Sequence, residues 1–272
     1  MQNEKYLKLK EILTGMGSIL VAHSGGTDST LVLKVAHDVL GDKVLAMTAV
    51  SASLPAADRA EAEQIARRIR VKHILVESDE TSNPEYLTNT PNRCFFCKKE
   101  TYRKLTAYTE QHGFHIIVDG TNADDIGDYR PGRQAASEYH VRSPLLEAGF
   151  TKAEIRQLSK ELGLPNWDKP AAACLSSRIP YGTTITLEAL SQVERAEALL
   201  RGLGLRQLRV RHHGPVARIE VEPRDFSHLL DHRDEIVTTL KAIGYTYVSL
   251  DLAGFRSGSM NDVIQKAPAE GQ

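Results

Sequence analysis

The chain has 272 residues, which predicts about two domains of roughly 150 residues each and allows a buried core without disulfide bridges. Hydrophobic residues make up 41% and charged residues 25%, and 34 basic against 35 acidic side chains give a net charge of −1 with the histidines neutral. This composition is typical of a soluble globular protein, and the lack of a basic excess argues against a nucleic-acid partner. No apolar run approaches the ~18 residues of a membrane span, and the charged N-terminus lacks the apolar core of a signal peptide. We therefore expect a cytoplasmic protein with no membrane contact.

Short apolar runs alternate with amphipathic stretches over the first 165 residues. The runs are residues 18–22, 44–50, 73–76 and 115–119, with a weaker one at 141–146. The amphipathic stretches, typical of helices, are residues 29–40, 55–70, 98–112 and 152–162. Continuous runs of Val, Ile and Leu are typical of strands covered on both faces, and alternating β and α elements predict an α/β fold with a doubly wound parallel sheet. Ligands of such sheets bind at the carboxyl ends of the strands.

The pattern changes between residues 163 and 170, where a glycine and two prolines interrupt both periodicities. Residues 171–184 have no clear period and predict a loop. A helical stretch at 187–203 then precedes two strands, 208–212 and 216–221, which flank a hairpin turn, followed by a helix at 226–243 and a strand at 245–252. We therefore predict a domain of residues 1–165, a linker loop of residues 166–185 that carries Cys174, and a smaller α+β domain of residues 186–272 for substrate binding or oligomerisation. The tail after Gln265 is expected to fray.

A glycine-rich loop, Ser24-Gly-Gly-Thr-Asp-Ser29, follows the first predicted strand. Because Gly25 and Gly26 have no Cβ atoms, an oxyanion can approach the backbone N–H groups, and the N-terminus of the next helix adds to this anion cradle. The loop lacks the lysine of a Walker A motif. Asp28 either caps the helix or holds Mg²⁺. The alternative interpretation is a tight turn with an Asp/Ser cap and no ligand.

A polar cluster follows the fourth predicted strand, within residues 119–125. It faces the same crevice as the glycine loop, because carboxyl ends of parallel strands lie at one edge of the sheet. This placement indicates that Gly120 and Asn122 contact a nucleotide and that Asp124 is a candidate Mg²⁺ ligand beside Asp28. Asx turns explain Asn122 and Asp124 equally well.

The hexapeptide SGGTDS resembles the pyrophosphate loop, SGGxDS, of the PP-loop ATP pyrophosphatase superfamily, whose fold is of the adenine nucleotide alpha hydrolase type. The resemblance implies that ATP is cleaved between its α and β phosphates, with an acceptor adenylated and pyrophosphate released. It also places residues 49–53 against the adenosine. The ATP-binding residues that it implies are Ala22, Ser24, Gly25, Gly26, Asp28, Ser29, Ser51, Gly120 and Asn122.

The three cysteines are Cys94, Cys97 and Cys174, too few for a disulfide scaffold and uneven in number. Cys94-Phe-Phe-Cys97 precedes a helix expected to begin near Lys98, and the helix N-terminus and neighbouring lysines favour the thiolate form. Buried structural thiols or a dithiol redox pair are two interpretations. A zinc site with His112 and His115 is a third. With Cys174 included, three thiolates could instead hold a [4Fe–4S] cluster and leave its fourth iron open.

Four motifs together resemble the LarE family of ATP-dependent sulfur transferases: SGGTDST at 24–30, DYRPG at 128–132, SSRIPYG at 176–182 and GFRSG at 254–258. The resemblance covers nearly the full length. It implies that ATP adenylates the carboxylates of pyridinium-3,5-biscarboxylic acid mononucleotide and that sulfur displaces AMP to give thiocarboxylates, during synthesis of the nickel-pincer nucleotide cofactor. In the three-cysteine members, the residues matching Cys94, Cys97 and Cys174 hold a [4Fe–4S] cluster. Single-cysteine members sacrifice the sulfur of the residue matching Cys174, which is the lesser option here. Asp28 and Cys174 are the expected catalytic residues.

An anionic mononucleotide substrate requires arginines for its carboxylates and phosphate. Arg209 and Arg211 share a face of one predicted strand, Arg256 lies in the GFRSG motif, and Arg178 follows Cys174 by four residues. Solvated surface arginines are the alternative. The expected partners are the substrate and sulfide or a sulfur donor, and a homo-oligomer is possible. Other functions left open are a PP-loop tRNA thiolase and a non-catalytic ATP-sensing or zinc-stabilised binding module.

Overall fold

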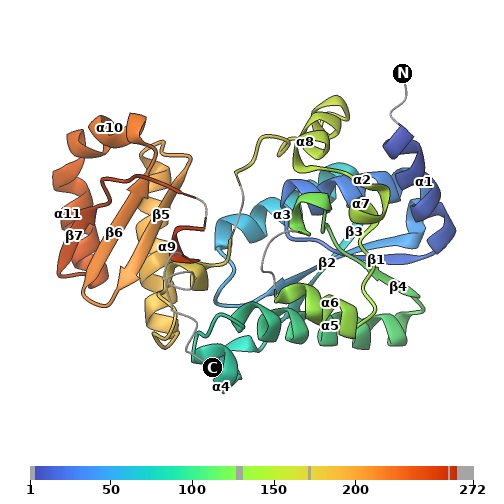
Figure 1. The fold of residues 1–272 in the computed structure, drawn as a ribbon, viewed down its shortest axis with the longest axis horizontal. Coiled ribbons are helices and arrows are strands. Elements are labelled where there is room, and N and C mark those ends of the chain that lie inside the picture. Colours follow the sequence, from blue (N-terminus) through green and yellow to red (C-terminus); the bar gives the residue numbers. More distant parts are fainter. Residues whose placement is uncertain (1–3, 127–130, 171–172, 257, 262–272) are drawn as a thin grey trace, which may run out of the picture. The chain divides into compact units, whose positions relative to one another are not determined.

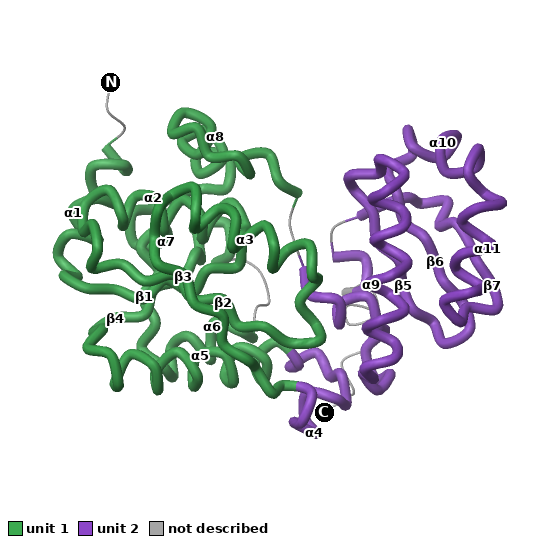
Figure 2. Tube along the Cα trace, turned by 180° about the vertical axis from the view of Figure 1, so that it is seen from behind, with its two compact units in different colours: residues 1–80, 94–172 green, residues 81–93, 173–272 purple. Residues whose placement is uncertain are grey.

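The computed structural model describes residues 4–126, 131–170, 173–256 and 258–261. The chain divides into two compact units, one of residues 1–80 and 94–172 and the other of residues 81–93 and 173–272 (Figure 2). Residues 81–93 group with the second unit although they lie within the range 1–165. Parts of two motifs, residues 128–130 and 257, fall outside the described residues, as do residues 171–172 of the predicted linker loop and the tail after Gln265. No described helix is long and apolar enough to cross a membrane.

The first unit is built on a four-stranded parallel sheet with the strand order β3-β2-β1-β4. The strands are β1 (Ile19–Ala22), β2 (Val44–Val50), β3 (Lys72–Glu77) and β4 (Ile116–Val118). The chain steps outward from β1 to β3 and then returns to the opposite side of β1 as β4. This reversal makes the carboxyl ends of β1 and β4 the topological switch point, where open α/β sheets bind ligands. The predicted α/β class is confirmed.

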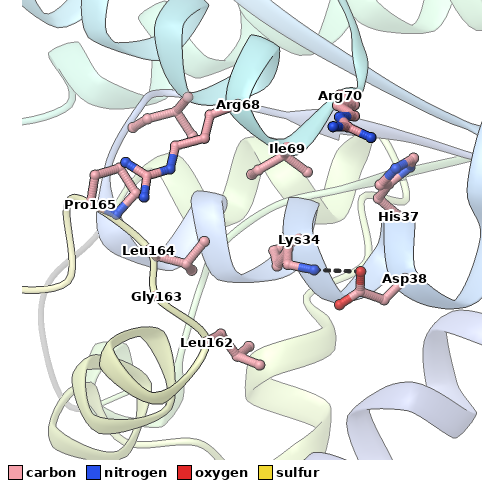
Figure 3. Close-up of a pocket in the computed structure, with 11 residues that line it drawn as sticks. Lys34, His37, Asp38, Arg68, Ile69, Arg70, Leu162, Gly163, Leu164 and Pro165 are labelled. Carbon is pink, nitrogen blue, oxygen red and sulfur yellow. Dashed lines mark hydrogen bonds and ion pairs between the residues drawn. The ribbon is translucent and has the colours of Figure 1, made fainter.

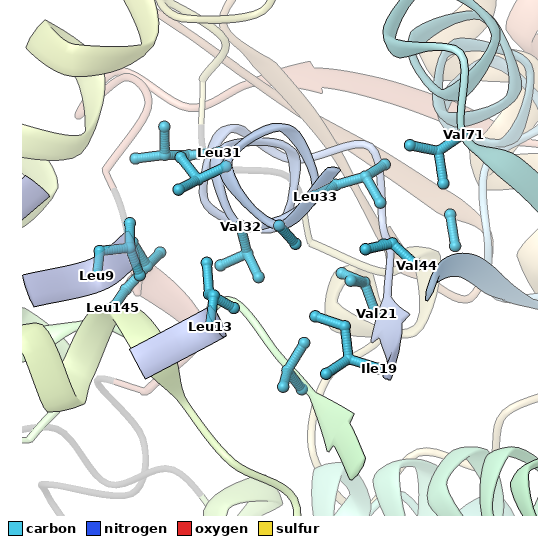
Figure 4. Close-up of a cluster of buried hydrophobic side chains, with 14 of the residues drawn as sticks. Leu9, Leu13, Ile19, Val21, Leu31, Val32, Leu33, Val44, Val71 and Leu145 are labelled. Carbon is cyan, nitrogen blue, oxygen red and sulfur yellow. The ribbon is translucent and has the colours of Figure 1, made fainter. Parts of the chain in front are cut away.

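Helices cover both faces of this sheet (Figure 1). They are α1 (Glu4–Met16), α2 (Thr27–Leu40), α3 (Ala56–Ile69), α7 (Pro144–Ala148) and α8 (Lys152–Glu161) on one face, and α5 (Arg93–His112) and α6 (Gly132–Glu138) on the other. Side chains that alternate along each strand supply two separate cores. Ile19 and Val21 lie on the side of β1 toward which Val32 of α2 points (Figure 4), whereas Leu20 shares a cluster with the α5 side chains Tyr102 and Leu105. Burial on both faces explains why these strands read as continuous apolar runs.

Two predictions in this unit are wrong. The weaker run at 141–146 forms only an isolated parallel bridge between Val118 and Arg142. Pro144 then begins α7, because its fixed φ suits the first turn of a helix and it removes a strand donor. The helix expected from Lys98 begins five residues earlier, at Arg93, so that both cysteines of the CxxC motif lie within its first two turns.

The second unit contains a three-stranded mixed sheet with the order β5-β6-β7. Its elements are α4 (Pro84–Leu87), α9 (Leu187–Gly202), β5 (Leu208–His213), β6 (Val216–Val221), α10 (Phe226–Asp231), α11 (Arg233–Ile243) and β7 (Tyr247–Leu250). β5 and β6 form the predicted antiparallel hairpin, and β7 pairs parallel to β6. The helix expected over 226–243 is broken at His232, which ends α10 and precedes α11. The predicted α+β class is confirmed.

Short 3₁₀ turns connect several of these elements. They are η1 (Gly41–Lys43), η2 (Glu80–Ser82), η3 (Ala123–Asp125), η4 (Leu175–Arg178), η5 (Pro223–Asp225) and η6 (Ser259–Asn261). Two of them bear on function. η3 lies at the carboxyl end of β4, at the switch point, and η4 directly follows Cys174.

Candidate active site

The glycine loop lies at the carboxyl end of β1 and leads into α2. Gly25 has a φ of +71°, in the left-handed region, and a Cβ built there would lie 3.1 Å from Cβ of Ala62 on α3. Only glycine meets both conditions without strain. Ser29 Oγ lies 3.2 Å from both Ser24 N, which donates to it, and Ser24 Oγ. No described side chain caps the α2 N-terminus at Gly26, so its first N–H groups can face an anion.

The turn after β4 packs directly on this loop. A Cβ on Gly120 would lie 2.7 Å from the backbone nitrogen of Ser29, which requires glycine at this position. Asn122 is buried, and its Oδ1 accepts a hydrogen bond from Asp124 N at 3.0 Å while Asp125 Oδ2 accepts from Asn122 N. The Asn122 side chain therefore caps η3, as an Asx turn would. Its contact with a nucleotide stays a prediction.

The two candidate Mg²⁺ ligands share a partner that the sequence analysis did not single out. Lys152, the first residue of α8, places Nζ 2.6 Å from Asp28 Oδ1 and 2.5 Å from Asp28 Oδ2. Its backbone N–H donates to Asp124 Oδ2 at 2.8 Å. The structure thus connects Asp28 and Asp124 through one lysine, beside the glycine loop.

The segment after α8 forms hydrogen bonds with the same loop, and the sequence analysis did not identify it. Asn166 is buried and donates from Nδ2 to Gly25 O and Thr30 Oγ1, both at 3.0 Å, and its carbonyl oxygen accepts from Thr27 Oγ1 at 2.9 Å. Lys169 Nζ forms ion pairs with two carboxylates of α3, at 2.9 Å and 2.7 Å. Asn166 therefore holds the glycine loop, Lys169 joins the same segment to α3, and no sequence pattern signals these contacts.

Two buried polar groups lie beside the loop and the ends of β2 and β3. Burial, followed by repulsion from His73, lowers the pKa of His23 to about 3, so the imidazole is neutral. Glu80 is 2% exposed, and its carboxylate accepts hydrogen bonds from the hydroxyls of Ser51, Ser53 and Ser78 at 2.5 to 2.6 Å. Ser51, an expected adenosine contact, is therefore held by a carboxylate that the sequence analysis did not identify.

The CxxC cysteines lie at the start of α5, and neither forms a disulfide. Cys94 is exposed and Cys97 half-buried. The zinc-finger interpretation is wrong: at 1.5 Å per residue, His112 at the far end of this helix is about 22 Å from Cys97 along its axis. His112 instead stacks on Tyr108, with 3.8 Å between ring centroids.

Cys174 lies in the second unit, in a loop held by buried hydrogen bonds. Arg178 is 2% exposed and donates from Nη1 to the carbonyl oxygens of Ala173 and Cys174, at 2.6 Å and 2.9 Å. Its Nε and Nη2 form a bidentate pair with Glu197 at 2.8 Å and 3.0 Å. In this structure the Arg178 guanidinium therefore organises the backbone of the cysteine loop.

Residues 81–93 hold the other side of this loop. Tyr86 Oη and Ser176 Oγ lie 2.5 Å apart, and Arg93 Nη1 donates to Ser176 O at 2.9 Å. Asn89 Nδ2 contacts three carbonyl oxygens between residues 179 and 183, at 2.8 to 3.2 Å. The segment just before the CxxC motif thus contributes directly to the conformation of the Cys174 loop.

The other candidate substrate arginines lie in the same unit. Arg211 is 5% exposed and donates to Glu220 Oε2 at 2.7 Å and to Ser177 O at 3.0 Å. Burial, followed by repulsion from Arg178, lowers the pKa of Arg209 to about 10, so it remains cationic at neutral pH. Arg256 is exposed. The structure brings Arg178, Arg209 and Arg211 near one another, with Glu197 and Glu220 as the counter-charges of Arg178 and Arg211.

Across the described residues, no three His, Cys, Asp or Glu side chains come together in a group that could hold a metal ion. A cavity of about 370 Å³ in the first unit lies between α2, α3 and residues 162–165 (Figure 3). Lys34, Arg68 and Arg70 line it, and Lys34 pairs with Asp38. Lys34 is seven residues beyond the start of α2, about 10 Å from the glycine loop along the helix axis. This cavity contains none of the predicted site residues.

The parallel sheet with a glycine loop at its switch point defines an ATP-using enzyme of the PP-loop class. In line with this, tRNA-specific 2-thiouridylase MnmA of Azorhizobium caulinodans is 27% identical over 56% of this chain and 48% of its own length. Pyridinium-3,5-bisthiocarboxylic acid mononucleotide synthase of Lactiplantibacillus plantarum is 41% identical over 97% of this chain and 96% of its own. The chain therefore belongs to the LarE family of sulfur transferases. An uncharacterized protein of Synechocystis is 46% identical over 98% of this chain and all of its own, and no family model matches.

Proposed function

We propose that this protein uses ATP to adenylate the carboxylates of pyridinium-3,5-biscarboxylic acid mononucleotide and then replaces AMP with sulfur. The product is the bis-thiocarboxylic acid mononucleotide of nickel-pincer nucleotide synthesis. The observation that carries this proposal is the 41% identity, over almost the whole of both chains, to a synthase of that thiocarboxylate. The site geometry supports each half of the reaction separately.

The activation step belongs to the first unit. A carboxylate oxygen of the substrate attacks the α-phosphorus of ATP, and pyrophosphate leaves. The free N–H groups at the α2 N-terminus, with Ser24 and Ser29, suit the phosphates of ATP and the leaving pyrophosphate. Asp28 and Asp124 supply the oxygen donors that Mg²⁺ prefers, and in our proposal they hold it. The step gives the substrate carboxyl a leaving group, AMP, that a free carboxylate lacks.

In our proposal the transfer step belongs to the Cys174 loop and the arginines of the second unit. Sulfur attacks the activated carbonyl carbon, the C–O bond to AMP breaks, and AMP leaves with both electrons of that bond. Arg209 is cationic and half-buried, a suitable partner for the carboxylate or phosphate of the substrate. Arg178 and Arg211 hold the loop itself through Cys174 O and Ser177 O. Arg256 is exposed, and in our proposal it contacts the substrate.

We further propose that Cys94, Cys97 and Cys174 hold a [4Fe–4S] cluster. None of the three forms a disulfide, none is fully buried, and thiolates are the usual ligands of such clusters. Arg93, directly before Cys94, donates a hydrogen bond to the carbonyl oxygen of Ser176, which follows Cys174 by two residues. This hydrogen bond supports the proposal that cysteines from both segments bind one cluster. A cluster bound by three cysteines would supply sulfide at its fourth iron and could be reloaded after each transfer.

The decisive experiment combines ATP, the pyridinium substrate and sulfide with protein reconstituted without oxygen. We expect a brown, oxygen-sensitive protein that releases AMP and pyrophosphate and forms thiocarboxylate over many turnovers. Cys94→Ala and Cys174→Ala should both lose the iron, its EPR signal and repeated turnover. A fully active Cys94→Ala variant that consumes only Cys174 would show sacrificial sulfur donation instead. AMP release that depends on RNA would favour a tRNA thiolase, and ATP bound unchanged would indicate a sensor.

A further inference from the structure

The cavity between α2, α3 and residues 162–165 has an excess of positive charge. Among the 11 described residues that line it, Lys34, Arg68 and Arg70 are cationic and Asp38 is the one acid. Lys34 Nζ lies 2.5 Å from Asp38 Oδ1, so these two charges compensate each other. Neither arginine side chain forms an ion pair with a residue that the structure describes. The cavity therefore carries two uncompensated guanidinium groups.

These two guanidinium groups come from the end of α3, on either side of Ile69. Arg68 extends toward Pro165, and Arg70 lies beside His37 (Figure 3). Because α3 ends at Ile69, Arg68 belongs to the last turn of the helix and Arg70 to the turn that follows it. Both charges are thus held close to a fixed helix end.

Arg70 adopts a backbone conformation that suits glycine better. Its φ is +68°, in the left-handed region, where it ends α3. Gly163, which ends α8 at the same cavity, has the same φ of +68°. Glycine takes this conformation without steric cost, whereas a residue with a Cβ does not. The cost accepted at residue 70 favours a role for the arginine side chain.

The rest of the cavity wall is mainly apolar. It consists of Ile65, Ile69, Leu162, Leu164 and Pro165, besides the backbone of residue 163. The volume of about 370 Å³ lies within the range of about 300 to 1,000 Å³ that small-molecule sites cover. Such sites combine an apolar lining with a few charged groups that orient the ligand. Charge and lining together suit an anion that has a carbon skeleton.

We propose that this cavity binds a small phosphate monoester. Arg68 and Arg70 would contact the phosphate, because guanidinium groups donate paired hydrogen bonds to phosphate oxygens. A phosphate monoester concentrates a charge of about −1.5 to −2 on one group, which matches two guanidinium charges better than a single carboxylate does. The apolar wall would contact the carbon skeleton. The site is separate from the glycine loop, so this inference goes beyond the proposed function and does not depend on it.

Calorimetry with ribose 5-phosphate as the probe tests this proposal. The protein is first saturated with Mg²⁺ and α,β-methylene-ATP, so that the probe does not bind at the glycine loop. We expect saturable binding with a dissociation constant below about 1 mM. Ribose should not bind, because it lacks the phosphate, and inorganic phosphate should bind at least threefold more weakly, because it leaves the apolar wall unused. Absence of saturable binding, or equal affinity for inorganic phosphate, would overturn the proposal.

Variants of the two arginines locate the site. Arg68→Gln and Arg70→Gln should each weaken binding of ribose 5-phosphate about tenfold or more, since each removes one charged hydrogen-bonding partner. Arg70→Gly keeps the left-handed turn, so it should be at least as stable as wild type in urea and should still weaken binding. This variant separates loss of the guanidinium from a folding defect. Wild-type affinity in Arg70→Gly would show that the cavity is not the site.

A matched control lies on the same helix. Arg67 is exposed, pairs with Glu63 at 3.8 Å and does not line the cavity. Arg67→Gln removes the same charge as Arg68→Gln and should leave the affinity for ribose 5-phosphate unchanged. If Arg67→Gln weakens binding as much as Arg68→Gln does, the probe responds to the general surface charge of α3, and the proposed site is wrong.

Discussion

Arg93 donates a hydrogen bond from Nη1 to the carbonyl oxygen of Ser176 over 2.9 Å, and the same nitrogen donates to Asn89 Oδ1 at 2.6 Å. Arg93 directly precedes Cys94, and Ser176 follows Cys174 by two residues. One buried guanidinium therefore ties the backbone next to one cysteine of the proposed cluster to the loop that carries another.

Replacing Arg93 should damage the proposed sulfur site more than the ATP site. Arg93→Ala leaves Asn89 Oδ1 and Ser176 O without this donor in a buried position, at a cost of about 2 to 4 kcal/mol in the free energy of unfolding. We expect the iron content after reconstitution to fall severalfold while ATP binding is retained. Iron analysis and urea denaturation measure the two effects. Arg224→Ala, at an exposed ion pair of the same unit, is the control, and normal iron content in Arg93→Ala would contradict the prediction.

The sequence predicts the elements whose pattern is local. Strands buried on both faces leave continuous apolar runs, as at 44–50, and the glycine loop carries its own motif. The start of α5 was misplaced because Cys94-Phe-Phe-Cys97 has neither a capping signal nor a polar face that distinguishes helix from turn. The run at 141–146 was wrongly interpreted as a strand because Pro144 is compatible with the start of a helix as well as with the end of a strand.

The polar contacts of the site could not be predicted from the sequence for a different reason. Lys152 and Asp28 are 124 residues apart, and Asn166 and Gly25 are 141 apart. Such pairs form only when the sheet order places separate loops at one edge, and a single side chain leaves no periodic signal. The carboxylate of Glu80, surrounded by three serine hydroxyls, belongs to the same class.

Asn166 should control the geometry of the glycine loop. Asn166→Asp replaces the amide donor to Gly25 O with a carboxylate oxygen, so that two hydrogen-bond acceptors face each other. The glycine loop and the segment that carries residue 166 should then move apart. We expect the KM for ATP to rise about tenfold or more, with the free energy of unfolding reduced by about 1 to 3 kcal/mol.

The control for Asn166 is Gln157→Ala, which removes an exposed amide from α8 and should leave both quantities unchanged. Pyrophosphate release at varied ATP concentration gives the KM. An Asn166→Asp variant that is destabilised but keeps the wild-type KM would show that this contact serves folding alone.

Glu197 should be among the most sensitive positions of the second unit. Its fully buried carboxylate accepts hydrogen bonds from Arg178, Arg201 and the backbone of Val210. Burial raises the pKa of Glu197. The attraction and hydrogen bonds of Arg178, with the attraction of Arg201 and Arg209, outweigh burial and hold the pKa below its ordinary value. Glu197→Gln leaves the buried Arg178 without a counter-charge, at a cost of about 3 to 5 kcal/mol. Glu188→Gln, exposed on the same helix, should cost less than about 0.5 kcal/mol in urea denaturation.

The Glu197 contribution also sets a pH dependence. A depressed carboxyl pKa gives stability that is present above the pKa of the unfolded chain and is lost as the pH falls through the folded value. Denaturation of wild type between pH 5 and pH 3 should show this loss, and Glu197→Gln should lack it. An identical acid slope in both proteins would contradict the assigned ion pair.

His23 should make the first unit less stable in mild acid. Its folded pKa is about 3 because it is buried, whereas the unfolded side chain titrates near 6.5. Between these values the unfolded state binds one more proton than the native state, so stability rises with pH and levels off above about 6.5. The slope expected from this residue is about 1.4 kcal/mol per pH unit. Because His23 Nδ1 lies 3.5 Å from Ser29 Oγ, its protonation should also disturb the glycine loop and weaken ATP binding.

The test for His23 compares denaturation of wild type, His23→Gln and His115→Gln at pH 7, 6 and 5. His23→Gln removes the titrating group and should flatten the slope by about 1 kcal/mol per pH unit, even though the variant is less stable at pH 7. His115 is exposed, and its replacement should leave the slope as in wild type. If His23→Gln and wild type lose stability in parallel from pH 7 to pH 5, the buried imidazole is not what titrates.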